Sequence, residues 1–148
     1  MFKKLRFAGI AASACLACMS ISAFADDHPY SEGNVVNVAR IRTVDGHFDD
    51  YMRWIATTWK QMQETAKKNG FLVSYQVMTV EARGPDDADV LLVTTYKNWA
   101  ALDGWIMKGD TLSKQVEGSV AAANQSEIER AKIRRVLGSS TMQVIDLK

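Results

Sequence analysis

The order of hydrophobic patterns along the chain predicts an α+β protein in which strand, helix, strand, strand, helix and strand follow one another. A β-branched run at 34–43 is typical of a strand, and a helical pattern at 47–69 contains neither proline nor glycine. Two apolar runs at 71–83 and 89–97 are separated by a turn sequence. Of the 148 residues, 47% are hydrophobic and 24% are charged, which excludes collagen-like and disordered proteins.

The first 25 residues predict a secretory signal peptide. A cationic start precedes an apolar run at 7–19, and the small-x-small triplet Ala23-Phe24-Ala25 follows. The apolar run is shorter than the roughly 20 residues of a membrane-spanning helix. We therefore expect cleavage after Ala25, a periplasmic or secreted location, and no membrane association once the signal peptide has been removed.

Removal of residues 1–25 changes the charge and the cysteine content. Three of the 18 Lys and Arg residues lie in this segment, so 15 remain against 17 Asp and Glu, a net charge of −2. The charges are mixed along the chain, which argues against a nucleic-acid surface. Both cysteines, Cys15 and Cys18, are also removed, which excludes disulfides and cysteine–metal sites. We expect a flexible arm at 26–33 and a single domain at 34–148.

The long helical pattern has one apolar face and a clear end. Its apolar residues recur at spacings of three and four: Phe48, Tyr51, Met52, Ile55, Trp59, Met62 and Ala66. Gly70 is the expected C-terminal stop. The strands at 71–83 and 89–97 then form a predicted hairpin across the sequence Gly84-Pro85-Asp86-Asp87.

The remainder of the chain completes the pattern. A short helix is expected at 98–105 with Asn98 as its cap. A longer helix is expected at 111–137 with a bend near Asn124, and a final strand at 141–147. The complete order is that of the ferredoxin-like βαββαβ fold.

Both faces of the predicted hairpin are apolar. One face carries Leu72, Met78, Val80, Leu91 and Val93, and the other carries Phe71, Val73, Tyr75, Val77, Val90 and Leu92. Two helices on one face of the sheet would leave the other face uncovered, and an apolar surface of that kind marks an interface. We therefore expect a homodimer in which a second copy covers the helix-free face.

Four segments together resemble the dimeric α+β barrel superfamily, which includes antibiotic-biosynthesis-monooxygenase-like proteins. These segments are VDGHFDDY at 44–51, GFLVSY at 70–75, PDDADVLLV at 85–93 and KNWAALD at 97–103. The resemblance is to an exported branch of that superfamily, and it implies an apolar or aromatic ligand with cofactor-independent monooxygenase-like activity. No cofactor is expected, because haem-degrading relatives use a haem-ligating His on the second helix and this chain has no His after residue 47.

A flank of the predicted helix carries the candidate ligand-binding residues Tyr51, Trp54 and Thr58. Aromatic and hydroxyl-bearing side chains beside the core stripe can line a pocket between helix and sheet. Tyr75, on the following strand, is a further candidate. The alternative is that Trp54 only packs against the short helix or a partner chain. In that case the protein is a non-catalytic homodimeric structural or protein-interaction module.

Arg40 and Arg42 lie on one face of the first predicted strand, because the side-chain period of a strand is two. If that strand is central, both guanidinium groups must meet carboxylates or an anionic ligand. Glu81 and Asp146 are the candidate partners for ion pairs. Ligand binding by Arg40 and Arg42 is the alternative.

Cleavage after Ala25 would make His28 the third residue of the exported chain, after Asp26 and Asp27. An amino group, two deprotonated amides and an imidazole can surround Cu(II) or Ni(II) in a plane of nitrogens. The alternative is a histidine placed there by chance. The other histidine, His47, is expected at the start of the long helix as a cap or a surface residue.

Overall fold

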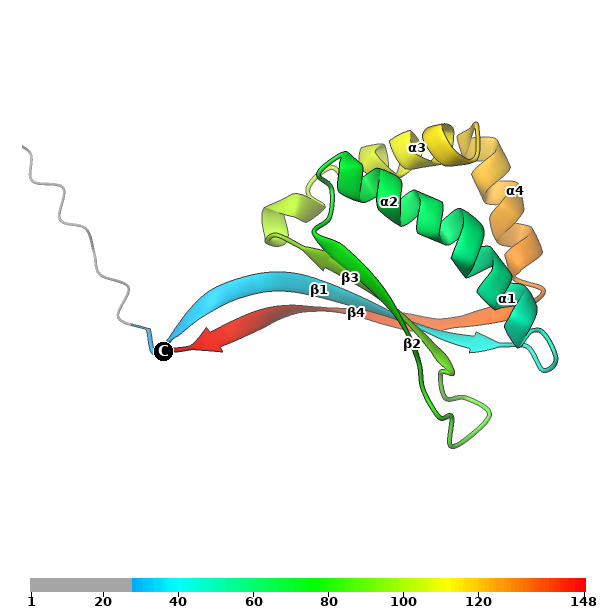
Figure 1. The fold of residues 1–148 in the computed structure, drawn as a ribbon, viewed down its shortest axis with the longest axis horizontal. Coiled ribbons are helices and arrows are strands. Elements are labelled where there is room, and N and C mark those ends of the chain that lie inside the picture. The colour runs from blue at the N-terminus through cyan, green and yellow to red at the C-terminus, as the bar shows by residue number, and fades with distance from the viewer. Residues whose placement is uncertain (1–27) are drawn as a thin grey trace, which may run out of the picture.

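The computed structural model describes residues 28–148 and has a ferredoxin-like α+β fold (Figure 1). The strands are β1 (Tyr30–Thr43), β2 (Ser74–Thr79), β3 (Val90–Tyr96) and β4 (Arg134–Leu147). The helices are α1 (Phe48–Trp54), α2 (Lys60–Lys68), α3 (Trp105–Val116) and α4 (Val120–Arg130). A π-helical segment, Ile55–Trp59, joins α1 to α2, and a 3₁₀ helix, Trp99–Leu102, precedes α3.

The four strands form one antiparallel sheet in the order β2-β3-β1-β4, and the helices lie on one face of it (Figure 1). β1 is central because it pairs with β3 on one side and with β4 on the other. The predicted order of elements and the fold class are therefore confirmed. None of the helices in the described part of the chain is long and apolar enough to cross a membrane.

Strand pairing extends two elements beyond their predicted limits. β1 begins at Tyr30, so residues 30–33, expected in the flexible arm, pair with the end of β4. β4 begins at Arg134 rather than at 141, because Arg134 and Arg135 pair with the end of β1. The two long strands form a ribbon that reaches beyond the rest of the sheet (Figure 1).

The helical pattern at 111–137 is divided earlier than predicted. The break lies at Gly118 rather than near Asn124, because Gly118 has a φ of 83°, a value that side chains with a Cβ rarely adopt. Ser119 then caps α4, and its hydroxyl accepts a hydrogen bond from the backbone N–H of Ala122 at 3.0 Å. α4 ends at Arg130, and β4 starts four residues later.

The core lies between the helices and the sheet. The consecutive helical segments at 48–68, from α1 to α2, are here called the first helical stretch. The buried core residues include Tyr51, Ile55 and Trp59 from this stretch, together with Val90 and Leu92 from β3. A second cluster contains Val35, Ala66, Leu72, Tyr96 and Leu112. Leu72 was expected on the helix-free face, but it precedes β2, which begins only at Ser74, and it is buried in this second cluster between the sheet and the helices.

The opposite face of the sheet, here called the open face, carries Val36, Val38, Met78, Leu91, Val93 and Met142. The register places Val93 beside Val38, and Leu91 beside Met78, on this face. Met78 is 46% exposed and Met142 is 48% exposed. An apolar sheet face without helices is therefore present, as the sequence predicted.

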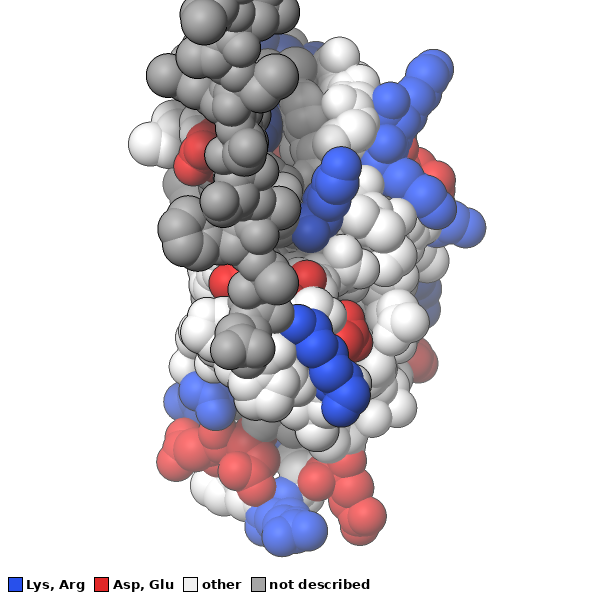
Figure 2. Space-filling view, turned by 90° about the vertical axis from the view of Figure 1, so that its left-hand side faces the viewer, with Lys and Arg blue, Asp and Glu red and all other residues white. Residues whose placement is uncertain are grey.

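Charged residues of both signs occupy the molecular face seen in Figure 2. Lys and Arg side chains lie near Asp and Glu side chains, with uncharged residues between them. This view does not present one continuous field of a single sign.

Candidate functional site

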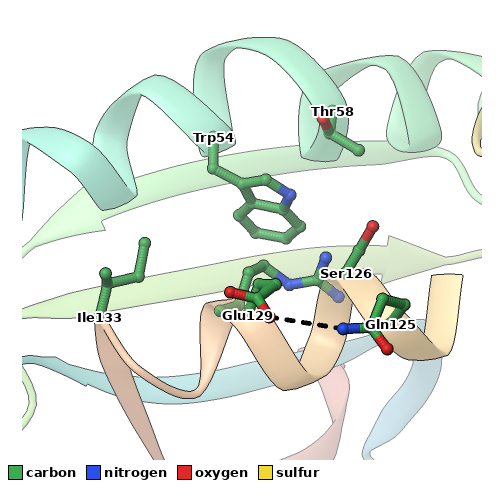
Figure 3. A pocket seen from close by; sticks show the side chains of 7 residues that line it. Trp54, Thr58, Gln125, Ser126, Glu129 and Ile133 are labelled. Atoms are coloured by element: carbon green, nitrogen blue, oxygen red, sulfur yellow. Dashed lines mark hydrogen bonds between the residues drawn. The ribbon is translucent and has the colours of Figure 1, made fainter. Parts of the chain in front are cut away.

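A cavity of about 330 Å³ lies between the first helical stretch and α4 (Figure 3). Its lining residues are Trp54, Thr58, Gln125, Ser126, Glu129, Arg130 and Ile133. Trp54 and Ile133 supply apolar surface, and the remaining side chains supply hydroxyl, amide and charged groups. The cavity thus combines an aromatic wall with polar groups that can orient a ligand.

The π-helical segment positions two of the cavity residues. Trp54 is the last residue of α1 and Thr58 lies inside the segment Ile55–Trp59. Both side chains point from the same helical stretch toward α4 (Figure 3). Single π turns within α-helices are rare and occur frequently at functional sites. The residue spacing predicted a shared flank for Trp54 and Thr58. The sequence pattern did not predict the π-helical segment.

Stacked aromatic rings and cations form the wall behind this cavity. The rings of Tyr51 and Trp54 stack with their centroids 5.6 Å apart and an interplanar angle of 17°. The guanidinium carbon of Arg130 lies 4.3 Å from the centroid of the Trp54 ring, and that of Arg134 lies 5.8 Å from the Tyr51 ring. Each cation therefore lies over the face of one ring, a favourable electrostatic arrangement.

One carboxylate, Glu127, binds both arginines. Its oxygens lie 2.6 Å from Nη2 of Arg130 and 2.7 and 2.8 Å from Nη2 of Arg134. The side chains of Arg130 and Arg134 are only 11% and 8% exposed, whereas Glu127 is 53% exposed. Nε and Nη1 of Arg130 and Nε of Arg134 are buried and have no hydrogen-bond partner within residues 28–148.

Sequence reasoning did not find Arg130, Glu127 and Arg134. The i,i+3 spacing of Glu127 and Arg130 on a helix was the available signal, because residues at that spacing are neighbours. Arg134 could not be placed in the same way, since it lies in β4 and not in a continued helix. Its proximity to Glu127 depends on where α4 ends.

Tyr51 lies behind the cavity and does not line it. It was predicted to contact a ligand, but its side chain is completely buried in the core. Its hydroxyl has no hydrogen-bond partner in the described part of the chain. Burial raises the pKa of Tyr51 to about 12, and the nearby Arg134 opposes this shift. The phenol is therefore neutral at ordinary pH and supports Trp54 from behind.

Tyr75 is also separate from the residues that line this cavity. It lies on the helix-facing side of β2, where its ring meets Trp59 edge-on with the centroids 5.3 Å apart. Its hydroxyl donates a hydrogen bond to Glu64, and this bond raises the pKa of Tyr75. The structure therefore brings Trp54 and Thr58 together and leaves Tyr75 in another contact.

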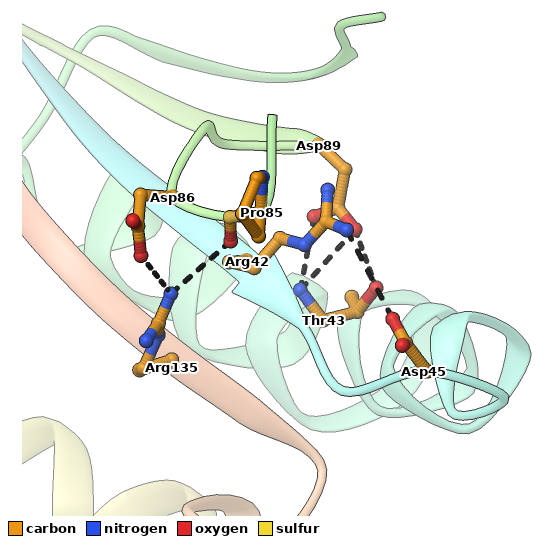
Figure 4. Close-up of polar contacts among 7 residues, drawn as sticks. All are labelled: Arg42, Thr43, Asp45, Pro85, Asp86, Asp89 and Arg135. Carbon is orange, nitrogen blue, oxygen red and sulfur yellow. Dashed lines mark hydrogen bonds and ion pairs between the residues drawn. The ribbon is translucent and has the colours of Figure 1, made fainter. Parts of the chain in front are cut away.

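Arg40 and Arg42 lie on the face of β1 away from the helices, and neither lines the cavity beside Trp54. Figure 4 shows Arg42 at the end of this strand. Arg42 pairs with Asp45 at 3.9 Å, so the predicted partners Glu81 and Asp146 are wrong for this residue. Asp45 lies in the turn from β1 toward α1, which brings its carboxylate back to Arg42. The prediction considered only carboxylates on other strands. Arg40 is exposed, and neither Glu81 nor Asp146 forms an ion pair with it among residues 28–148.

The end of β1 carries a second polar cluster. The carboxylate of Asp89 accepts hydrogen bonds from the backbone N–H and the hydroxyl of Thr43, while Arg135 lies 2.9 Å from Asp86 (Figure 4). A cavity of about 310 Å³ adjoins these residues. Its charged groups are already paired, so this cluster mainly fixes the loop before β3 against β1 and β4.

The two histidines lie apart from the cavity residues. Asp26 and Asp27 of the predicted copper site lie outside the described residues, and the imidazole of His28 stacks on Tyr30 with ring centroids 5.4 Å apart. No group of three His, Cys, Asp or Glu residues within 28–148 is arranged to hold a metal ion. His47 precedes α1, and its Nδ1 lies 2.9 Å from the carboxylate of Asp50.

Comparison with known proteins supports the fold. No protein-family model and no curated protein matches the chain. A solved structure described as a dimeric ferredoxin-like protein from an uncultured marine organism is 14% identical with a TM-score of 0.53, covering 77% of this chain and 96% of that chain. HapK from Hahella chejuensis is 13% identical with a TM-score of 0.49, covering 73% of this chain and 90% of that chain. The first of these similarities agrees with the ferredoxin-like fold.

The substitution Tyr51→Phe tests the buried phenol. The raised pKa means that the folded state favours the neutral hydroxyl, so this contribution is complete below pH 10 and is lost as the pH rises toward about 12. Between these limits the free energy of unfolding of the unmodified protein should fall more steeply than that of Tyr51→Phe, by up to about 2–3 kcal/mol. Urea denaturation at a series of pH values measures the difference.

Tyr30→Phe is the matched control, because it removes a hydroxyl from a tyrosine that is 36% exposed. Its pH profile should follow that of the unmodified protein. At pH 7 the Tyr51→Phe protein should be at least as stable as the unmodified protein, since the lost hydroxyl has no partner in the described chain. Parallel alkaline profiles for Tyr51→Phe and the unmodified protein would contradict the assignment.

Proposed function

We propose that this protein binds a small, mainly apolar or aromatic molecule in the cavity beside Trp54. The observation that carries the proposal is the combination of an indole wall next to a π-helical segment and a nearly buried guanidinium group that lies over the indole ring. The cavity volume of about 330 Å³ lies within the range of small-molecule sites, roughly 300–1,000 Å³.

Binding is the step that the cavity side chains support. Trp54 and Ile133 offer apolar contacts, while Thr58 and Ser126 offer hydroxyl groups. The carboxylate of Glu129 is held by Lys132 and Gln125, and the bond from Lys132 lowers the pKa of Glu129. Glu129 is therefore ionised and hydrogen-bonded at neutral pH, and it places a negative charge on the cavity wall. Monooxygenase-like chemistry in this cavity would need dioxygen as the oxidant and an electron-rich aromatic ligand that supplies the electrons, because the lining side chains supply no reductant.

We also propose that the protein is exported and acts in the periplasm or outside the cell. The support is the charge, the apolar run and the small-x-small triplet within residues 1–25. The absence of cysteine after residue 18 is compatible with an oxidising compartment. A binding protein with these properties would meet its ligand outside the cytoplasm.

A homodimer through the open face is the second part of the proposal. Met78, Leu91 and Val93 form part of an apolar surface that no helix of the described chain covers. The ferredoxin-like protein of similar fold is described as dimeric. A second copy placed against this face would remove the apolar side chains from water, the main favourable term in such association.

The substitution Trp54→Ala tests the binding site. Trp54 is partly exposed beside a cavity, so its removal should cost about 1–3 kcal/mol of stability, less than the roughly 3–5 kcal/mol of a fully buried Trp. Aromatic compounds that raise the melting temperature of the unmodified protein should fail to do so for Trp54→Ala, because a ligand stabilises only the state that binds it. Thermal-shift measurements with the same compounds compare the two proteins.

Trp99→Ala is the control for Trp54→Ala. Trp99 is 49% exposed, lies in the 3₁₀ helix, and donates a hydrogen bond to Gln143 rather than lining the cavity. The control protein should retain the ligand-induced shifts. Equal ligand-induced shifts for Trp54→Ala and the unmodified protein would mean that binding occurs elsewhere and would remove the proposal.

The dimer proposal predicts a molecular mass by light scattering of about twice that of one chain at micromolar concentration. Val93→Asp places a charge in the centre of the open face and should shift the protein toward monomers, because an uncompensated charge is costly to bury. Ile106→Asp is the control, since Ile106 is 82% exposed on α3 and lies on the helix side. A monomeric unmodified protein, or a Val93→Asp dimer as strong as the control, would contradict the sheet interface.

A further inference from the structure

We infer that the ligand of the Trp54 cavity is an aromatic monoanion, such as an aryl carboxylate, whose oxygens are bound by Arg130. This inference rests on the proposed function and adds the chemical class of the ligand. It is carried by the hydrogen-bonding groups of Arg130 that have no partner among residues 28–148 and by the charges around them. An aryl carboxylate has both of the groups that this site is built to contact: a ring and an anionic pair of oxygens.

Arg130 has unused donors beside the cavity. Its Nη2 donates to Glu127, but its Nε and Nη1 have no hydrogen-bond partner within residues 28–148. A guanidinium group stays charged at all ordinary pH values, and a buried donor without an acceptor is costly. A carboxylate is the acceptor that best matches a guanidinium edge, because two parallel hydrogen bonds form between them.

The surrounding charges leave room for one more anion. Glu127 is shared between Arg130 and Arg134, so two cations have one carboxylate between them. Glu129 lines the same cavity, but its oxygens are engaged by Lys132 and Gln125. The charge of Asp89 contributes to the raised pKa of Tyr51. The oxygens of Asp89 accept hydrogen bonds from Thr43. Among these carboxylates of the described residues, Glu127 alone forms an ion pair with Arg130.

Binding of the anion requires a change in the conformation of the Arg130 side chain. Nε and Nη1 of Arg130 are covered by protein atoms in this conformation, so the guanidinium group must turn its edge toward the cavity to receive the anion. Such a turn of the Arg130 side chain would leave Arg134 with its two hydrogen bonds to Glu127. The ligand ring then contacts Trp54 and Ile133, which line the same cavity.

Calorimetric titration with a matched pair of probes tests this inference. Naphthalene-2-carboxylate and naphthalene-2-carboxamide have nearly the same shape, but only the first is an anion. The unmodified protein should bind the carboxylate about tenfold or more tightly than the carboxamide, the usual advantage of a hydrogen bond between charged groups. Arg130→Gln should remove this preference while changing the carboxamide affinity little.

Three further variants separate the causes. Arg130→Lys keeps the positive charge but cannot form two parallel hydrogen bonds to a carboxylate, so it should retain part of the preference. A partial preference in this variant would show that the loss in Arg130→Gln does not come from a folding defect. Arg135→Gln is the matched control, because Arg135 is 58% exposed and pairs with Asp86 away from the cavity. It should behave as the unmodified protein. Glu129→Gln should increase the preference for the carboxylate over the carboxamide, because it removes a negative charge from the cavity wall.

The outcomes distinguish this inference from the proposed function. Equal affinities for the two probes, both lost in Trp54→Ala, would overturn the anionic ligand and leave aromatic binding in place. A carboxylate preference that persists in Arg130→Gln would also overturn it. Failure of both probes to bind, or binding that Trp54→Ala does not weaken, would overturn the proposed function itself.

Discussion

The contact of two arginine cations with two stacked aromatic rings connects the end of α4 and the start of β4 to α1. Arg130 lies over Trp54, Arg134 lies over Tyr51, and Glu127 binds both guanidinium groups. A buried cation is costly unless it is paired, so the chain must bring Glu127 close to both arginines. This requirement fixes where α4 ends and how the cavity between α4 and the first helical stretch is shaped.

The same contact holds the Trp54 ring from both sides at the edge of the cavity. The ring has Tyr51 stacked against it and Arg130 over it, while the π turn follows directly in the chain. Tyr51 contributes by its position in the core and by remaining neutral, since burial raises its pKa. The Trp54 ring is therefore positioned before a ligand binds, so binding costs little side-chain entropy at this residue.

Much of the fold could be predicted from the sequence, because local patterns determine it. The apolar stripe of the long helix, the β-branched strands and the turn at Gly84 gave the correct order of elements and an apolar sheet face. The helix break was misplaced although Gly118 and Ser119 are local signals, whereas the errors in strand length arose where pairing between distant segments decides the outcome. The sheet includes residues 30–33 because the start of β1 pairs with the end of β4, and it includes residues 134–140 because the start of β4 pairs with β1. No local pattern indicates this pairing.

The candidate site was predictable only in part, for the same reason. The spacing of Trp54 and Thr58 placed them on one flank, and both line the cavity. Arg130, Glu127 and Ile133 come from a segment more than 60 residues away, and their approach depends on the packing of α4. Tyr75 was predicted as a further ligand-binding residue, but it does not line this cavity and its hydroxyl is bound by Glu64.

The central claim is that the Trp54 cavity is where a ligand binds, and the most direct measurement is nuclear magnetic resonance of the indole N–H groups. The chain has four Trp residues, and their signals can be assigned by single substitutions. On titration with naphthalene-2-carboxylate the Trp54 signal should move progressively, while that of Trp99, bound to Gln143, stays in place. Movement of the Trp99 or Trp105 signal with an unchanged Trp54 signal would contradict the account.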